Sequence, residues 1–310
     1  MMKKKDHDLS GQIFPKKLIL IYNTMWDEPV EYPIDEIPDE FIISTDRSLM
    51  QQADAVLFHL PSLYKELEKD LEKPDGQLWI AWSMECEVNY PWTRHPEITK
   101  MFDLWMGYHQ SDDIIHPYYD ATFISSFREP VPFSNKQNKM CMFVSSSFNK
   151  SKRIDYLEEL MRYTPIDSYG TVLNNRHITN DLGRETKLDI ISKYKFTVAF
   201  ENAIAPDYVT EKFFDPLLKG SVPVYMGAPN IIDFSPGENC FIDVRQFENP
   251  KALANFINSC YEDQSLYDLF FEWRKKDLLS SFIEKADQQR IHPIVRLCLK
   301  VREKLKEKNK

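Results

Sequence analysis

The stretch that decides the fold runs from residue 200 to residue 229 and reads FENAIAPDYVTEKFFDPLLKGSVPVYMGAP. It starts at the end of a buried apolar run, residues 196–200, and continues through a polar loop. A helix is expected to begin after Thr210, a favourable N-cap residue. A second apolar run, residues 221–226, follows the helix. Strand, loop, helix and strand in this order predict an α/β domain with a mainly parallel sheet.

Polar residues in this stretch indicate a binding site. In open α/β sheets, ligands bind beyond the carboxyl ends of the strands. Glu211 and Lys212 fall in the first turn of the expected helix, and Pro216 must kink or shorten that helix. A helix N-terminus with a lysine beside it is suited to a diphosphate. A capped surface helix carrying a solvated Glu–Lys pair would give the same pattern, so the residues alone leave both interpretations open.

The rest of the chain repeats the alternation of strands and helices. Strands are expected over residues 17–22, 41–43, 53–59, 77–82, 140–144, 166–170, 196–200 and 221–226. Helices are expected over residues 64–72, 154–163, 188–193 and 250–262. An acidic exposed loop covers residues 27–40, and residues 129–139 have the composition of a linker. These patterns predict two α/β domains, residues 1–135 and 140–275, and a helical tail, 276–310, that packs back on the first domain.

Composition excludes several classes of protein. A length of 310 residues suggests about two domains, and the net charge of −9 argues against a general nucleic-acid binder. The five cysteines form no Cys-x-x-Cys pair, which disfavours a zinc ribbon and a disulfide scaffold. With only 8 glycines, the chain lacks the glycine-rich dinucleotide and P-loop motifs. No apolar run is long enough to span a bilayer.

Several motifs together resemble a known family. The most specific are F-E-N at residues 200–202, D-Y-V-T-E-K at 207–212 and G-S-V-P-V-Y-M-G at 220–227. Supporting matches are W-S-M-E at 82–85, F-D-L-W-M-G-Y at 102–108 with S-D-D at 111–113, V-S-S-S-F-N at 144–149 with Arg153, and I-D-S-Y-G at 166–170 with Asn174 and Asn175. These motifs resemble those of the α-1,3-fucosyltransferases of glycosyltransferase family 10.

The resemblance implies a GT-B fold, with two Rossmann-like domains facing across a cleft and the donor domain in the second half. It implies an inverting transfer of L-fucose from GDP-β-L-fucose to the 3-OH of GlcNAc in a lactosamine-type glycan, with the 4-OH as an alternative. No cofactor is required, and a divalent metal would be at most stimulatory. Two other hypotheses stay open: a GT-B transferase with another nucleotide-sugar donor, and a non-catalytic nucleotide- or sugar-binding protein.

By resemblance, Glu85 holds the position of the general base, at the end of the strand expected over residues 77–82. Glu87 is the competing base. Arg153 and Lys212 would neutralise the diphosphate, unless Arg153 is a solvated residue at the start of its helix. Glu201 would be either a donor contact or a partner of the N-cap. The remaining candidates for donor contacts are Glu211, Tyr208, Asn202, Tyr169, Asn149 and Asn175. The candidates for acceptor contacts are Glu87, Trp92, Tyr90 and Trp105.

The C-terminal segment, residues 296–310, contains seven basic and two acidic residues, a local charge of +5. The pattern fits a solvated helix end, and a weak contact with an anionic membrane surface is the alternative. The first residues are basic but lack a following apolar region, so no secretory signal is predicted. We therefore expect a bacterial cytoplasmic enzyme, peripheral to the inner membrane, that acts on surface-glycan precursors of the lipopolysaccharide or Lewis-antigen type.

Overall fold

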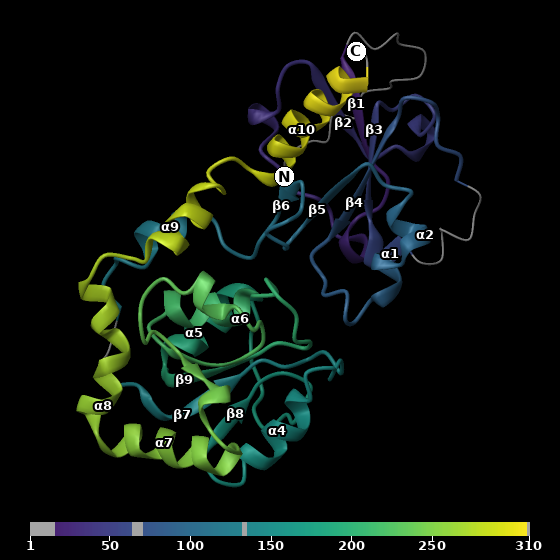
Figure 1. The fold of residues 1–310 in the computed structure, drawn as a ribbon. Helices are drawn as coiled ribbons and strands as arrows, with labels where there is room; N and C mark the ends of the chain where they lie inside the picture. The colour runs from purple at the N-terminus through teal and green to yellow at the C-terminus, as the bar shows by residue number, and fades with distance from the viewer. Residues whose placement is uncertain (1–15, 64–70, 132–134, 309–310) are drawn as a thin grey trace. The chain divides into compact units, whose positions relative to one another are not determined.

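The computed structural model describes residues 16–63, 71–131 and 135–308, and the chain forms two compact units (Figure 1). The first unit comprises the described parts of Met1–Ser83, His95–Met106 and His292–Lys310. The second unit comprises the described parts of Met84–Arg94 and Gly107–Ile291. The chain therefore passes from the first unit to the second twice, at residues 83–84 and 106–107, and returns to the first unit at residues 94–95 and 291–292.

The first sheet has the strand order β2-β1-β3-β4-β5-β6. Its strands are β1 Lys17–Ile21, β2 Phe41–Ser44, β3 Ala55–His59, β4 Leu78–Ser83, β5 Leu104–Gly107 and β6 Ile114–Ile115. Strands β2, β1, β3 and β4 pair in parallel. Strand β3 is buried along its whole length, as expected for an apolar run in a sheet that is covered on both faces.

Three helices accompany the first sheet: α1 Leu60–Leu63, α2 Pro96–Thr99 and α10 Pro293–Lys308. Helix α10 buries an apolar stripe that includes Ile294, Leu297 and Val301. Its exposed side contributes ion pairs, among them Arg302 with Glu40 at 3.3 Å. Most of the helix expected over residues 64–72 lies outside the described residues, which stop at 63 and resume at 71.

The second sheet is parallel throughout and has the order β11-β10-β9-β7-β8. Its strands are β7 Gln137–Met142, β8 Ile166–Ser168, β9 Tyr194–Phe200, β10 Val222–Met226 and β11 Ile242–Asp243. Side chains of β9 alternate between two cores: Phe196, Val198 and Phe200 pack with α4 and α7, and Ala199 packs with α6 and α9. Helices therefore cover both faces of this sheet.

The helices of the second unit are α3 Thr122–Ser126, α4 Arg153–Leu160, α5 Arg184–Ser192, α6 Glu211–Leu218, α7 Pro250–Glu262, α8 Gln264–Asp268 and α9 Ser280–Asp287. Short 3₁₀ helices of the chain cover Met25–Asp27, Ile34–Glu36, Arg47–Leu49, Pro91–Arg94, Ile231–Phe234, Val244–Gln246 and Leu269–Lys275. Helix α6 ends two residues after Pro216, in agreement with the short helix that this proline predicts.

The unit boundaries differ from the predicted domains, 1–135, 140–275 and 276–310. Residues 84–94, 107–135 and 276–291 group with the second unit. Aromatic packing explains the difference, because Phe127 shares a buried cluster with Phe214 of α6 and Phe282 of α9. The expected linker is also shorter, since β7 already begins at Gln137. Its first residues are polar, so backbone pairing with β9, rather than hydrophobicity, makes them a strand.

The strand order of each sheet reverses between two neighbouring strands, and this position is where doubly wound sheets bind ligands. In the second sheet, β7 lies between β8 and β9, so the chain leaves adjacent strands β7 and β9 in opposite directions along the sheet. Strands β1 and β3 occupy the equivalent position in the first sheet. Ligands of doubly wound α/β sheets bind beyond the carboxyl ends of such strands. The topology therefore predicts that ligands bind at the loops that follow β7, β9, β1 and β3.

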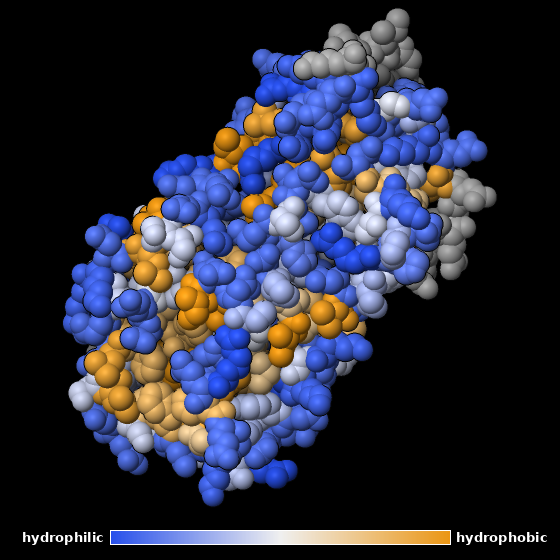
Figure 2. All heavy atoms as spheres, in the orientation of Figure 1, coloured by the Kyte–Doolittle hydropathy of each residue, from blue (hydrophilic) through white to orange (hydrophobic). Residues whose placement is uncertain are grey.

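Hydrophilic side chains predominate on the face drawn in Figure 2, with apolar groups between them. Large hydrophobic residues with more than half of their surface exposed include Trp26, Ile34, Leu182, Ile232 and Leu269. Among the helices that the structure describes, none combines the length and the apolar character needed to cross a bilayer.

Candidate functional site

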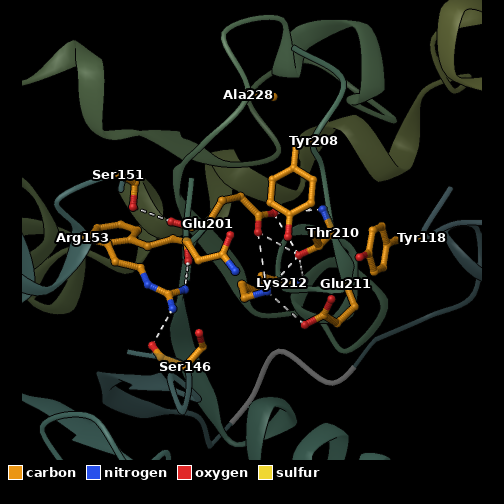
Figure 3. A network of polar contacts seen from close by, with 12 residues as sticks. Tyr118, Ser146, Ser151, Arg153, Glu201, Tyr208, Thr210, Glu211, Lys212 and Ala228 are labelled. Atoms are coloured by element: carbon orange, nitrogen blue, oxygen red, sulfur yellow. Dashed lines mark hydrogen bonds and ion pairs between the residues drawn. The ribbon is translucent and has the colours of Figure 1, made fainter. Parts of the chain in front are cut away.

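A network of buried polar groups lies at the carboxyl ends of β7 and β9 (Figure 3). The loop after β7 contributes Ser146 and Ser151 and leads into α4, which begins at Arg153. The loop after β9 contributes Glu201 and leads to Thr210 and α6. This is the stretch in which the sequence predicts a binding site.

Glu201 fixes the start of α6. The carboxylate of Glu201 is fully buried and accepts hydrogen bonds from the backbone N–H and the hydroxyl of Thr210, each at 2.9 Å. Thr210 in turn caps the helix by accepting from the Lys212 N–H. Of the two predicted roles for Glu201, the geometry matches the partner of the N-cap. Gly227 belongs to the same arrangement, since a Cβ there would collide with Glu201 and Tyr225.

Arg153 lies across the ends of both strands. Its Nη1 donates to the carbonyl of Phe200 (3.0 Å) and its Nη2 to the carbonyl of Ser146 (2.9 Å). The residue is 1% exposed, which rules out a solvated helix end, and its Nε has no hydrogen-bond partner among the described residues. Burial lowers the pKa of Arg153, although nearby Glu201 opposes this effect. A buried guanidinium with an unused N–H is suited to an anion.

Lys212 provides a second, half-buried cation at the first turn of α6. Its Nζ lies 3.1 Å from Thr210 Oγ1 and 3.5 Å from Glu201 Oε2. Burial lowers the pKa of Lys212, but Glu201 and Glu211 outweigh it and keep the pKa above the usual value. Burial raises the pKa of Glu211, but Lys212 and Lys187 outweigh it and bring the pKa down to about 2. Both side chains are therefore charged at neutral pH.

Glu85 follows β4 in sequence and belongs to the second unit. Burial raises the pKa of its carboxyl; Lys212 opposes this effect and Glu211 reinforces it. Glu85 therefore lies within electrostatic range of the α6 turn. The neighbouring Met84 carbonyl accepts a hydrogen bond from the Tyr118 hydroxyl at 2.6 Å, which anchors this loop. A half-buried carboxyl with a raised pKa is suited to accept a proton near neutral pH.

Glu87 has the opposite environment. Its Oε2 accepts a hydrogen bond from the Tyr108 hydroxyl and lies 3.2 Å from Nε2 of His109. Burial raises the pKa of Glu87, but these two partners outweigh it and lower the pKa to about 2. A carboxylate with so low a pKa is a weak base. The local chemistry thus separates the two candidate bases, and it favours Glu85.

His109 connects the Glu87 loop to the loop that precedes α6. Its Nδ1 lies 3.7 Å from Asp207 Oδ2, while its Nε2 faces Glu87. Burial lowers the pKa of His109, but the two carboxylates outweigh it and raise the pKa to about 9. Asp207 is held further by Asn230, whose Nδ2 donates to it at 2.9 Å. Sequence reasoning missed His109 and Asp207, because only the fold brings them together.

Several predicted contact residues maintain loops. Asn149 caps α4 by accepting from the Ile154 N–H (2.9 Å). Asn175 exchanges hydrogen bonds with the backbone of Ser168 and Ile166. The side-chain oxygen of Asn202 accepts from Asn89 Nδ2 at 2.9 Å, which joins the Glu85 loop to the loop after β9. These interactions explain the asparagines without a ligand.

The predicted aromatic contacts fall in different places. Tyr208 is buried against Tyr108, with ring centroids 5.0 Å apart, and its hydroxyl end points toward the Thr210–Lys212 turn (Figure 3). Tyr169 stacks on Phe143 at 5.3 Å. The remaining candidates are Tyr90, which lies edge-on to Phe148, Trp92, in the turn Pro91–Arg94, and Trp105, in β5 of the first unit.

Among the described residues, no three histidine, cysteine or acidic side chains lie close enough to hold an ion. Arg153 and Lys212 together offer two positive charges and at least one unused N–H donor to an anionic ligand.

Comparison with known proteins identifies the family. Residues 133–310 match the model of the C-terminal domain of glycosyltransferase family 10 (fucosyltransferase), and residues 15–119 match that of the fucosyltransferase N-terminal domain. The chain belongs to glycosyltransferase family 10. The resemblance carried by the sequence motifs is thereby confirmed.

Among curated relatives, GDP-fucose protein O-fucosyltransferase 3 of Rattus norvegicus is 39% identical over 218 residues, covering 66% of this chain and 45% of the relative. Alpha-(1,3)-fucosyltransferase B of Drosophila melanogaster is 30% identical over 246 residues, covering 74% of this chain and 55% of the relative. The chain thus spans about half the length of these relatives.

A solved α1,3-fucosyltransferase with GDP superposes with a TM-score of 0.62 at 16% identity, covering 97% of this chain and 93% of that one. A related structure with GDP-fucose gives a TM-score of 0.61 at 14% identity. This likeness confirms the predicted GT-B fold class.

Proposed function

We propose that the protein transfers L-fucose from GDP-fucose to a hydroxyl group, with inversion at the anomeric carbon. The observation that carries the proposal is the pair of cations formed by the buried Arg153 and the half-buried Lys212 at the carboxyl ends of β7 and β9, where doubly wound sheets bind nucleotides. Family membership supports the choice of sugar, and relatives of this chain carry names that include GDP-fucose.

In this proposal, Arg153 and Lys212 bind the diphosphate. Arg153 directs its unused Nε–H to a phosphate oxygen, and Lys212 acts as a point charge at the N-terminus of α6. Both cations stabilise the negative charge that develops on GDP as the bond to fucose breaks. Because these side chains supply the positive charge, we expect transfer to continue in the presence of a chelator.

Glu85 acts as the general base in the transfer step. It removes the proton of the acceptor hydroxyl while that oxygen attacks the anomeric carbon of fucose. The bond from this carbon to the diphosphate oxygen breaks, and GDP leaves with the electron pair. The proton on Glu85 then passes to solvent. Burial raises the pKa of Glu85 and so improves its match to the proton transfer.

Two classes of acceptor follow from different observations. The sequence motifs resemble enzymes that use the 3-OH of GlcNAc, and the 4-OH is the alternative in type-1 chains. The 39% identity to a protein O-fucosyltransferase favours a second candidate, a hydroxyl group on a protein. The two products differ chemically, because an O-fucose on serine or threonine is released by alkaline β-elimination, whereas fucose on an N-glycan is removed together with the glycan.

The deciding experiment measures GDP release from GDP-fucose with N-acetyllactosamine or a glycosidase-treated protein mixture as acceptor, for wild type, Glu85→Gln and Glu87→Gln. We expect acceptor-dependent turnover in the wild type and a loss of roughly 10²- to 10⁴-fold in Glu85→Gln with GDP affinity unchanged. Glu87→Gln is the matched control and should retain more of the activity. Full activity of Glu85→Gln would reject this base, and an absence of GDP binding would reject the proposed function.

A further inference from the structure

A second polar group lies in the first unit, at the carboxyl ends of β1 and β3. Asn23 follows β1, and its Nδ2 donates to the carbonyl of His59 (2.8 Å) and to Ser62 Oγ (2.9 Å). The Asn23 side-chain oxygen accepts from the His59 N–H at 3.0 Å. These bonds tie the two loops at the position where the topology of the first sheet predicts a ligand.

The hydrogen bonds assign the tautomer of His59. The hydroxyl of Ser62 donates its only proton to a backbone carbonyl, that of Thr24 at 3.0 Å being the nearest. Ser62 Oγ also lies 2.8 Å from His59 Nδ1. With the serine proton directed to a carbonyl, an Nδ1–H donor satisfies this pair, and we assign this tautomer from the hydrogen-bond geometry. His59 Nε2 therefore carries a lone pair.

That lone pair has no partner. His59 is 0% exposed, and its Nε2 makes no hydrogen bond to any described residue. Burial lowers the pKa of His59 to about 4, so the ring is neutral at pH 7. A buried acceptor without a donor destabilises the fold. The group is suited to a neutral ligand that donates a hydrogen bond, and it offers no positive charge to a phosphate.

Two tryptophans lie edge-on to the His59 ring. The ring of Trp82 is 5.2 Å away and buried, and that of Trp26 is 5.8 Å away and 52% exposed. Trp26 and Asp27 both have left-handed backbone conformations, with φ values of 50° and 65°. Such a conformation is strained for a bulky residue, and strained residues concentrate at binding sites. Trp26 thus combines contact with His59, exposure to solvent and local strain.

We propose that Trp26 and His59 form a subsite for a pyranose of the acceptor, whose hydroxyl donates to His59 Nε2 while its apolar face packs on Trp26. The inference rests on the proposed function in that a fucosyltransferase needs an acceptor site. A sugar offers both a hydroxyl donor and an apolar face, which a diphosphate does not. Because His59 is 0% exposed, a neighbouring side chain must move for a sugar to reach Nε2, and Trp26 is its exposed neighbour.

The kinetic test uses the full chain and the variants Trp26→Ala and His59→Gln, with N-acetyllactosamine as the acceptor. We expect the acceptor KM to rise at least tenfold in both variants, while the KM for GDP-fucose and kcat of Trp26→Ala stay within twofold of wild type. Ile34→Ala is the control, because Ile34 is a more exposed residue of the same unit at 73%. An unchanged acceptor KM in Trp26→Ala would overturn the subsite.

A binding test does not depend on turnover. Side-chain ¹⁵N spectra of the GDP-bound wild type, with the His59 signal assigned by its loss in His59→Gln, are recorded during titration with N-acetyllactosamine. We expect the Nε2 resonance to shift upon saturation. An Nε2 resonance that does not shift would overturn the subsite, and this holds also if the enzyme transfers fucose only to proteins. An equal shift upon titration with inorganic phosphate would overturn it as well. Failure of GDP-fucose to bind would reject the proposed function separately.

Discussion

The two sheets share one strand order but differ in the chemistry at the equivalent place. Beyond β7 and β9, the second unit buries the charged groups of Arg153 and Glu201, and the half-buried Lys212 lies close to Glu201. Beyond β1 and β3, the first unit buries neutral groups, Asn23 and His59. In both proposals, topology gives the place where the ligand binds, and the side chains there favour an anionic ligand in the second unit and a neutral one in the first.

The difference has an energetic side. Burying a charge costs several kcal/mol unless partners compensate for it. Arg153 has only backbone carbonyls as hydrogen-bond partners, and Glu201 lies near it without a direct hydrogen bond. The second unit therefore has an incompletely compensated cation, whereas the first has an unused lone pair on a neutral ring. We propose that a different ligand compensates for each deficit: a diphosphate for the cation and a hydroxyl group for the lone pair.

The largest expected effect tests the charged side of this comparison. Replacing Arg153 with methionine removes the buried cation but preserves much of the apolar volume. We expect GDP affinity, measured by calorimetry, to fall roughly 100-fold, because a charge-assisted hydrogen bond such as that from Arg153 Nε to the diphosphate contributes about 1.5–3 kcal/mol. Arg176→Met is the control, since Arg176 is half-exposed and pairs with Asp167 at 3.0 Å. If Arg153→Met bound GDP with wild-type affinity, the result would contradict a cationic GDP site beyond β7 and β9.

Much of the structure around the loops after β7 and β9 could be predicted from the sequence, because the residues that determine it are close together in the chain. The apolar runs predict the strands, and Thr210 predicts the start of α6. Glu201 and Thr210 are nine residues apart, yet they form the cap because the loop folds back on itself. The motif contains both residues but does not reveal which role Glu201 has.

The unpredicted parts depend on contacts between distant segments. Asn149 and Asn175 are predicted donor contacts, and the structure shows that their side chains also hold loops. Glu87 is the predicted competing base, and its contacts with His109 and Tyr108, more than twenty residues later in the chain, lower its pKa and argue against that role. The unit boundaries were missed for the same reason, since packing around Phe127 is invisible in the linear pattern.

A smaller expected effect is a difference between the two proposed sites in how strongly the KM of each substrate depends on ionic strength. Between about 50 and 500 mM NaCl, we expect the KM for GDP-fucose to rise roughly threefold, because salt screens the attraction between the cations and the diphosphate. The KM for N-acetyllactosamine should stay constant, since the His59 group is neutral at pH 7. Steady-state kinetics with each substrate varied in turn measure both values. An equal salt dependence for both substrates would contradict the distinction.

The smallest effect concerns the ion pairs that join loops within the charged unit. The pKa of His109 is raised from 6.5 to about 9, so its stabilisation is present below pH 6.5 and is lost as pH rises through 9. The pKa values of Glu87 and Asp207 are lowered to about 2, so their contribution is lost only in strong acid. We expect the Tm to fall by roughly 2–4 °C between pH 6.5 and 9, and His109→Gln to lack this decline. The control is His177→Gln, an exposed residue of the same unit. If His177→Gln and His109→Gln lose stability with pH alike, the decline does not come from the contacts of His109 with Glu87 and Asp207.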